Sequence, residues 1–144
     1  ASNLLHLFLE IYQNLVMKEA LLQCHNTGYL LLSSICFVFA SSIFLEDNQV
    51  LNIGNSIINV IFTPGHSPGH ISLYSEEDSF IICGDVLFDG SIGRTDLPGG
   101  NYLQLIKSIK TRILPLGDDI KVYSGHGEPT TTGKERRTNP FLVF

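Results

Sequence analysis

The sequence lacks an excess of positive charge and carries few charged residues of either sign. Charged side chains make up 16% of the 144 residues, and the formal net charge is −5 at pH 7. Binding to nucleic acid or to an anionic membrane needs clustered Lys and Arg, so the charge gives no reason to expect either partner. Hydrophobic residues reach 44%, which argues against a disordered chain and is enough for one domain with a buried core.

Cysteine is also scarce, and its spacing gives no sign of a disulfide framework. The three residues, Cys24, Cys36 and Cys83, are odd in number, lie in apolar surroundings and form no CxxC pair. That pattern is typical of buried free thiols in a reducing compartment. We therefore expect a cytoplasmic protein, and we predict that no cysteine acts as a nucleophile.

One segment, residues 29–45, contains no charged side chain at all. A membrane-spanning helix usually needs about 20 apolar residues. This run is shorter, is interrupted by serines, and is followed by the acidic residues Glu46 and Asp47. A buried helix or a pair of strands is therefore favoured, and a membrane-tethered protein is the weaker alternative.

Glycine and proline are nearly missing from residues 1–46 and are concentrated in residues 47–144. We treat 1–144 as a single domain with an apolar N-terminal segment, 1–46, that includes a helix over about 9–24. In the second part, alternating apolar residues and turn residues predict five strands and one helix. The predicted strands cover 49–53, 57–62, 71–75, 79–83 and 120–124, and the helix covers 101–114. Strands that alternate with a helix indicate a layered α/β domain.

Three side chains that can bind metal each follow a strand-like run and have a glycine directly before them. His66 lies in the turn TPGHSPGH (63–70), Asp85 follows Gly84, and His126 follows Gly125. Side chains at strand ends along one edge of a sheet converge, and zinc accepts imidazole nitrogen and carboxylate oxygen. A carboxylate can also bridge two metal ions. The pattern therefore predicts that His66, Asp85 and His126 form a metal site.

Residues 47–144 resemble the metallo-β-lactamase superfamily, and in particular its glyoxalase II-like (hydroxyacylglutathione hydrolase-type) hydrolases. The matching segments are TPGHSPGH (63–70), ICGDVLFDGSIGRTDLPGG (82–100), YSGHGEPTT (123–131) and TNPFL (138–142). The resemblance implies an αββα sandwich of the α/β (α+β) class and the hydrolysis of a small-molecule thioester by metal-activated hydroxide. It also implies that His66 binds a first metal, that Asp85 is catalytic and bridges two metals, and that His126 binds the second. Zinc is the expected metal, and iron and manganese are alternatives.

The sequence departs from the superfamily in two respects: it contains no HxHxDH motif, and we expect the family's N-terminal strands to be missing. The nearest candidates are His6 and Glu10, which would take the first His and the Asp positions of that motif. An apolar helix start with an incidental His and Glu is the interpretation that we favour. Two complete metal sites cannot then be filled. We therefore expect impaired catalysis, and the alternative is a non-catalytic, truncated domain that acts in binding or as a homo-oligomer.

Other polar residues have weaker assignments. His70 is expected to make a hydrogen bond near the site rather than to bind metal. Arg94 and Asp96 either contact substrate or, as we favour, form an ion pair that fixes their loop. The charge run 134–137 is typical of a solvated face. Tyr102 is expected in the core, with its hydroxyl group at the surface.

Overall fold

The computed structural model of the protein describes residues 45–53 and 55–143. They belong to one compact unit, Leu45–Phe144. Several predictions lie outside the described residues, namely those on His6, Glu10, Cys24, Cys36, the helix over 9–24 and nearly all of 29–45. No helix in the described part of the chain is long and apolar enough to cross a membrane.

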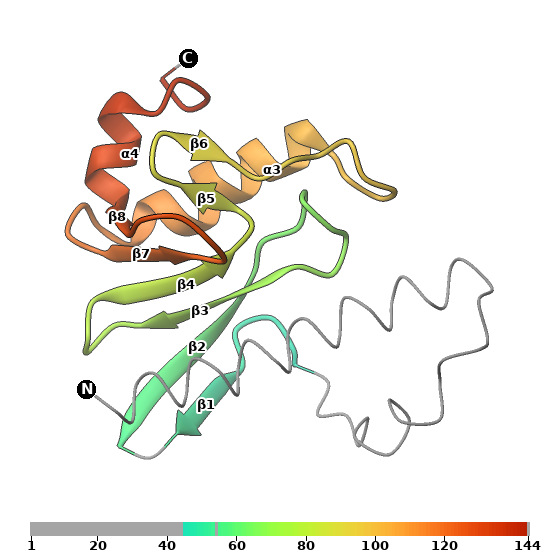
Figure 1. The fold of residues 1–144 in the computed structure, drawn as a ribbon. Helices are drawn as coiled ribbons and strands as arrows, with labels where there is room; N and C mark the ends of the chain where they lie inside the picture. Colours follow the sequence, from blue (N-terminus) through green and yellow to red (C-terminus); the bar gives the residue numbers. More distant parts are fainter. Residues whose placement is uncertain (1–44, 54, 144) are drawn as a thin grey trace, which may run out of the picture. The chain divides into compact units, whose positions relative to one another are not determined.

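A mixed sheet forms the frame of this unit (Figure 1). Its six strands, in spatial order, are β1 (Val50–Ile53), β2 (Ser56–Phe62), β3 (Ile71–Ser75), β4 (Phe80–Gly84), β7 (Lys121–Ser124) and β8 (Thr130–Thr131). The five predicted strands are confirmed, and none differs by more than one residue at either end. Three short strands were not predicted: β8 and the two that form a separate hairpin, β5 (Leu87–Phe88) and β6 (Ser91–Ile92).

The pairing of β4 with β7 explains where two of the candidate ligands emerge. These two strands run parallel, whereas all other neighbours in the sheet are antiparallel. In the parallel pair Gly84 lies opposite Ser124, so both strands end at the same edge. Asp85 and the loop that carries His126 therefore leave the sheet side by side.

A helical segment packs on one face of the sheet. Helix α3 (Tyr102–Ser108) begins as predicted at Asn101, whose side-chain oxygen accepts a hydrogen bond from the backbone N–H of Gln104. The helix continues as a π-helical turn, Ile109–Ile113, and ends in a 3₁₀ turn, Leu114–Leu116, which contains Pro115. Its buried side chains, which include Leu105 and Ile109, form one core with sheet residues such as Ile81, Cys83 and Val122.

One expectation for the helices is wrong, and a second holds for three of its four residues. Tyr102 is 47% exposed, because it lies in the first turn of α3, ahead of Leu105, where burial begins. The charge run 134–137 belongs to a second helix, α4 (Thr132–Thr138), and one of its members, Glu135, is fully buried.

The opposite face of the sheet is apolar as well, and Ile58, Val60 and Leu73 on that face are buried. A sheet that is apolar on both faces is typical of the central layer of a sandwich. The mixed sheet with helices confirms the α/β (α+β) fold class.

Candidate functional site

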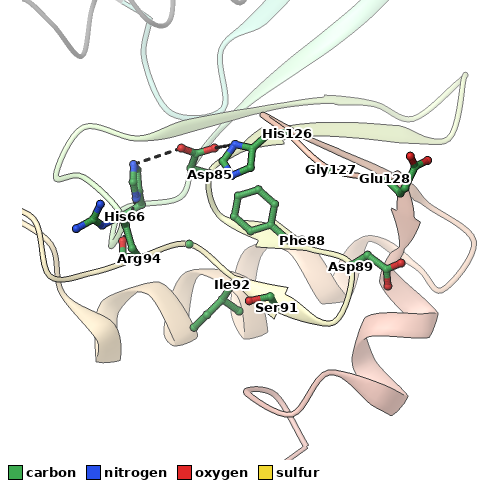
Figure 2. Close-up of a pocket in the computed structure, with 11 residues that line it drawn as sticks. His66, Asp85, Phe88, Asp89, Ser91, Ile92, Arg94, His126, Gly127 and Glu128 are labelled. Atoms are coloured by element: carbon green, nitrogen blue, oxygen red, sulfur yellow. Dashed lines mark hydrogen bonds and ion pairs between the residues drawn. The ribbon is translucent and has the colours of Figure 1, made fainter.

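The three predicted ligands lie together at one edge of the sheet, where they border a pocket of about 370 Å³ (Figure 2). His66 comes from the turn between β2 and β3, Asp85 follows β4, and His126 follows β7. The hairpin β5–β6 provides the apolar side chains Phe88 and Ile92 to the same pocket.

The turn that carries His66 is held by helix α3. The backbone N–H of Asn101 donates to the carbonyl oxygen of Gly65 at 2.7 Å, and the Ser108 hydroxyl donates to that of Pro64 at 2.6 Å. Gly65 has a φ of 141°, and a Cβ at this position would collide with the backbone of Leu105. Only glycine fits so close to the helix, so the backbone next to His66 is fixed by direct contact.

The imidazole of His66 is fixed as well, and only 10% of its side chain is exposed. Its Nδ1 lies 2.9 Å from the carbonyl oxygen of Arg94, which can only accept a hydrogen bond, so Nδ1 carries a proton. In the neutral ring the lone pair is then on Nε2, which faces Asp85 Oδ2 at 3.8 Å (Figure 2). A metal ion between these two electron-rich atoms would be attracted by both, so the donor atoms fit a bound metal ion.

Asp85 sits between two close-packed glycines. A Cβ on Gly93 would collide with the carbonyl oxygen of Asp85, and a Cβ on Gly125 would lie 2.5 Å from Asp85 Oδ1. The backbone N–H of Gly125 also donates to the carbonyl oxygen of Gly84 at 3.0 Å. These contacts set the direction of the carboxylate, which remains 38% exposed and faces the pocket.

His126 is the most exposed of the three, with 74% of its side chain accessible. Its Nδ1 lies 3.4 Å from Asp85 Oδ1. Its ring stands 4.7 Å from that of Phe88, centroid to centroid, at an interplanar angle of 39°. The backbone carbonyl of His126 accepts a hydrogen bond from the Ser124 hydroxyl at 2.9 Å.

The carboxylate of Asp85 therefore presents a different oxygen to each histidine. This geometry suits a carboxylate that bridges two ions, with one imidazole nitrogen on each side. Within residues 45–53 and 55–143, no group of three or more potential ligands surrounds a single point. A catalytic zinc normally has three protein ligands, so each half-site is one donor short of that number in this part of the chain.

His70 lies behind His66 and does not line the pocket. It is buried, its Nδ1 is 3.2 Å from Thr63 Oγ1, and that hydroxyl is 2.8 Å from Ser72 Oγ. The His70 and His66 rings meet edge to face, with centroids 6.0 Å apart. Burial, together with the nearby His66, lowers the pKa of His70 to about 4. His70 is thus a neutral support of the turn at neutral pH.

Arg94 and Asp96 form the expected ion pair. The Nε and Nη2 atoms of Arg94 donate to the two carboxylate oxygens of Asp96, each at 2.8 Å. The hydrogen bond from Arg94 lowers the pKa of Asp96 to about 2. Arg94 lines the pocket, and 62% of its side chain is exposed.

The hairpin β5–β6, which forms one wall of the pocket, was not predicted from the sequence. Its strands are only two residues long, too short to show a hydrophobic period. A signal was present, however, because Asp89–Gly90 is a dipeptide typical of two-residue hairpin turns, and apolar residues flank it.

Comparison with known proteins identifies the class that this fold and site define. The sequence pattern of the metallo-beta-lactamase superfamily matches residues 6–126, so the chain belongs to this superfamily. The predicted family and its αββα sandwich are thereby confirmed.

Individual relatives fall within the same group. The chain is 48% identical over 99 residues to the hydroxyacylglutathione hydrolase GloC of Haemophilus influenzae, covering 69% of this chain and 47% of that protein. It is 48% identical over 98 residues to the probable metallo-hydrolase YqgX of Bacillus subtilis, covering 68% and 46%. The chain thus spans about half the length of the curated relatives that it matches.

Solved structures agree with this assignment. The B3 metallo-beta-lactamase BLEG-1 superimposes with a TM-score of 0.67 at 48% identity, over 70% of this chain and 48% of that one. The protein TTHA1623, solved in a di-iron-bound form, superimposes with a TM-score of 0.62 at 45% identity, over 68% and 47%.

Proposed function

We propose that this chain carries part of the metal centre of a hydrolase that cleaves small-molecule thioesters. The observation that supports it best is the Asp85 carboxylate, which faces His66 Nε2 with one oxygen and His126 Nδ1 with the other at the mouth of a pocket. The thioester substrate class is supported by the similarity to a hydroxyacylglutathione hydrolase.

In this proposal His66, Asp85 and His126 hold the metal, with zinc as the first choice. Iron is the alternative, because a similar protein has been solved with two iron ions. A metal held there supplies an activated water near neutral pH and polarises a carbonyl group. The chain itself orients His66 through the Arg94 carbonyl and lines the pocket with the apolar surfaces of Phe88 and Ile92.

One basic residue at the pocket, Arg94, suits a carrier with an anionic group, whereas the other charged residues that line it, Asp85, Asp89 and Glu128, are acidic. The Arg94 guanidinium at the rim provides a positive charge, and it can rearrange from Asp96 because both groups are exposed. Cys83 is a buried free thiol, and a free thiol suits the proposed cytoplasmic location. Burial raises the pKa of this thiol to about 12.

Zinc stoichiometry and thioester hydrolysis test the proposal together. We expect zinc to bind the loaded chain, a hydroxyacylglutathione thioester to be cleaved, and both properties to be lost in Asp85→Asn. Asp119→Asn, at an exposed turn, removes the same charge elsewhere and is the matched control. Less than about 0.1 equivalent of zinc per chain after loading contradicts the proposal, because a half-site too weak to hold metal cannot act.

A non-catalytic domain is the second candidate, and one observation favours it. Each half-site has only one imidazole and one carboxylate oxygen among the described residues. A chain that binds no zinc but sediments as a stable oligomer supports this function, whereas a zinc-loaded monomer with thioesterase activity excludes it.

A further inference from the structure

We propose that Glu135 is a positioning residue for His126, and that it acts through the β5–β6 hairpin and through Thr130. The inference rests on the proposed function, because His126 matters as a metal ligand only there. It starts from an unexpected burial: Glu135 is 0% exposed, although its neighbours Lys134, Arg136 and Arg137 all face solvent.

The buried carboxylate of Glu135 accepts hydrogen bonds from three neutral donors. The Thr130 hydroxyl donates to Oε1 at 2.5 Å, and both the Gly90 backbone N–H and Asn139 Nδ2 donate to Oε2, at 3.0 and 2.7 Å. Asn139 is buried too, and its Nδ2 also donates to the carbonyl oxygen of Ser91 at 3.0 Å. Buried polar groups that are satisfied in this way hold their partners in one arrangement.

The two segments that Glu135 joins are those on either side of His126. Gly90 and Ser91 form the end of the hairpin whose other strand carries Phe88, the ring that stands 4.7 Å from the imidazole. Thr130 lies on β8, directly after the loop that carries His126. Figure 2 shows Phe88 beside His126.

The hydrogen bonds of Glu135 hold the two segments beside His126, whereas few contacts hold the His126 ring itself. Its side chain is 74% exposed, and the protein contacts described for its ring are those with Asp85 and Phe88. Loss of the Glu135 carboxylate frees the hairpin end and β8 together, so Phe88 and the loop can both shift. Residues that orient metal ligands from outside typically change metal affinity by about 10–100-fold.

If Glu135 only stabilised the fold, its replacement would leave the His126 ring and the zinc affinity of the folded chain unchanged. Matched variants separate this structural role from a positioning role. Glu135→Ala removes all three hydrogen bonds. Glu135→Gln can keep them, because its amide oxygen can accept from Gly90 and Asn139 while its NH₂ donates to the Thr130 hydroxyl. Lys134→Ala breaks a link from α4 to the same turn, the 2.6 Å ion pair with Asp89, but this link is at the surface.

The test uses the NMR signals of the His126 ring protons in the metal-free chain, together with zinc affinity measured by chelator competition. We expect Glu135→Ala to lose the ring-current shift from Phe88 and to bind zinc about 10–100-fold more weakly. Glu135→Gln and Lys134→Ala should match the wild type in both measurements. A folded Glu135→Ala with unchanged His126 signals and zinc affinity overturns the proposal, as does the same loss in Lys134→Ala.

The proposal can also be tested if Glu135→Ala does not fold or if the wild type binds no zinc. If Glu135→Ala does not fold, Thr130→Val removes the single bond to β8, and unchanged His126 signals in that variant overturn the proposal. If the wild type binds no zinc, the proposed function fails, yet the metal-free His126 signals still decide whether Glu135 positions this ring.

Discussion

The two histidines of the candidate site are held in opposite ways. His66 is 10% exposed, its ring donates to the Arg94 carbonyl, and its turn rests on helix α3. His126 is 74% exposed, and its ring contacts Phe88. In our proposal its orientation depends on Phe88 and on the buried hydrogen bonds of Glu135, which does not touch the ring. One imidazole is thus fixed by direct contacts and the other indirectly, so the two should respond to different substitutions.

The largest effect on zinc affinity is expected at Asp85, which faces both His66 and His126. We call the parts of the site around these two histidines the His66 side and the His126 side. Asp85→Asn replaces one oxygen of the shared carboxylate by an NH₂ group, which cannot bind a metal, and removes the negative charge. We expect zinc affinity to fall on the order of 100-fold or more, as measured by chelator competition. Asp119→Asn should leave it unchanged, and an equal loss in that control would show that net charge rather than ligation is responsible.

The comparison can be sharpened with one glycine from each side. Gly65 and Gly127 both have positive φ, 141° and 90°, so alanine strains the backbone at either position by about 1–2 kcal/mol. A Cβ at Gly65 also collides with Leu105, whereas no atom lies within 4 Å of a Cβ at Gly127. Overpacking adds about 1–3 kcal/mol, so Gly65→Ala should be the more destabilising of the two in urea unfolding. Equal losses would mean that α3 does not hold the His66 turn rigidly.

The His66 side should also show a pH dependence of stability that arises from His70. Burial lowers the pKa of His70 from 6.5 to about 4. Between these values the unfolded chain binds a proton that the folded chain does not, so stability is present above pH 6.5 and is lost as the pH falls towards 4. The full effect is about 3 kcal/mol in the metal-free protein. His70→Asn should remove this part of the pH slope, and an unchanged slope would show that His70 is not neutral in the fold.

The smallest effect on folding is expected at the rim. The Arg94 guanidinium is exposed and paired with Asp96, whereas the contact that holds His66 uses the backbone carbonyl of Arg94. Arg94→Gln should therefore leave the melting temperature and the zinc affinity unchanged, because exposed ion pairs contribute little. If the guanidinium binds an anionic group of the substrate, KM rises while the metal site stays intact. A lower zinc affinity would show that the side chain supports His66 after all.

The contrast between the two sides also explains what the sequence could predict. Apolar alternation located the five longer strands, and a glycine before each of His66, Asp85 and His126 marked the strand ends that converge. On the His66 side, the position of helix α3 followed from the local spacing of apolar residues.

The support of His126 could not be predicted in the same way. The burial of Glu135 depends on Gly90, 45 positions away, and nothing in a charge run distinguishes one buried carboxylate from solvated neighbours. The hairpin strands were too short for a period, although the Asp-Gly dipeptide marks their turn. In the structure the ring of His66 is more firmly oriented than that of His126, a difference that the sequence pattern does not reveal.

The central claim is that Asp85 lies between two metal half-sites, one completed by His66 Nε2 and the other by His126 Nδ1. Long-range ¹H–¹⁵N NMR of the histidine rings during zinc titration tests it most directly, since it reports which ring nitrogen binds metal. The account predicts that His66 binds through Nε2 and keeps its Nδ1 proton on the Arg94 carbonyl, and that His126 binds through Nδ1. Coordination of His66 through Nδ1, or a titration in which neither ring responds to zinc, would contradict it.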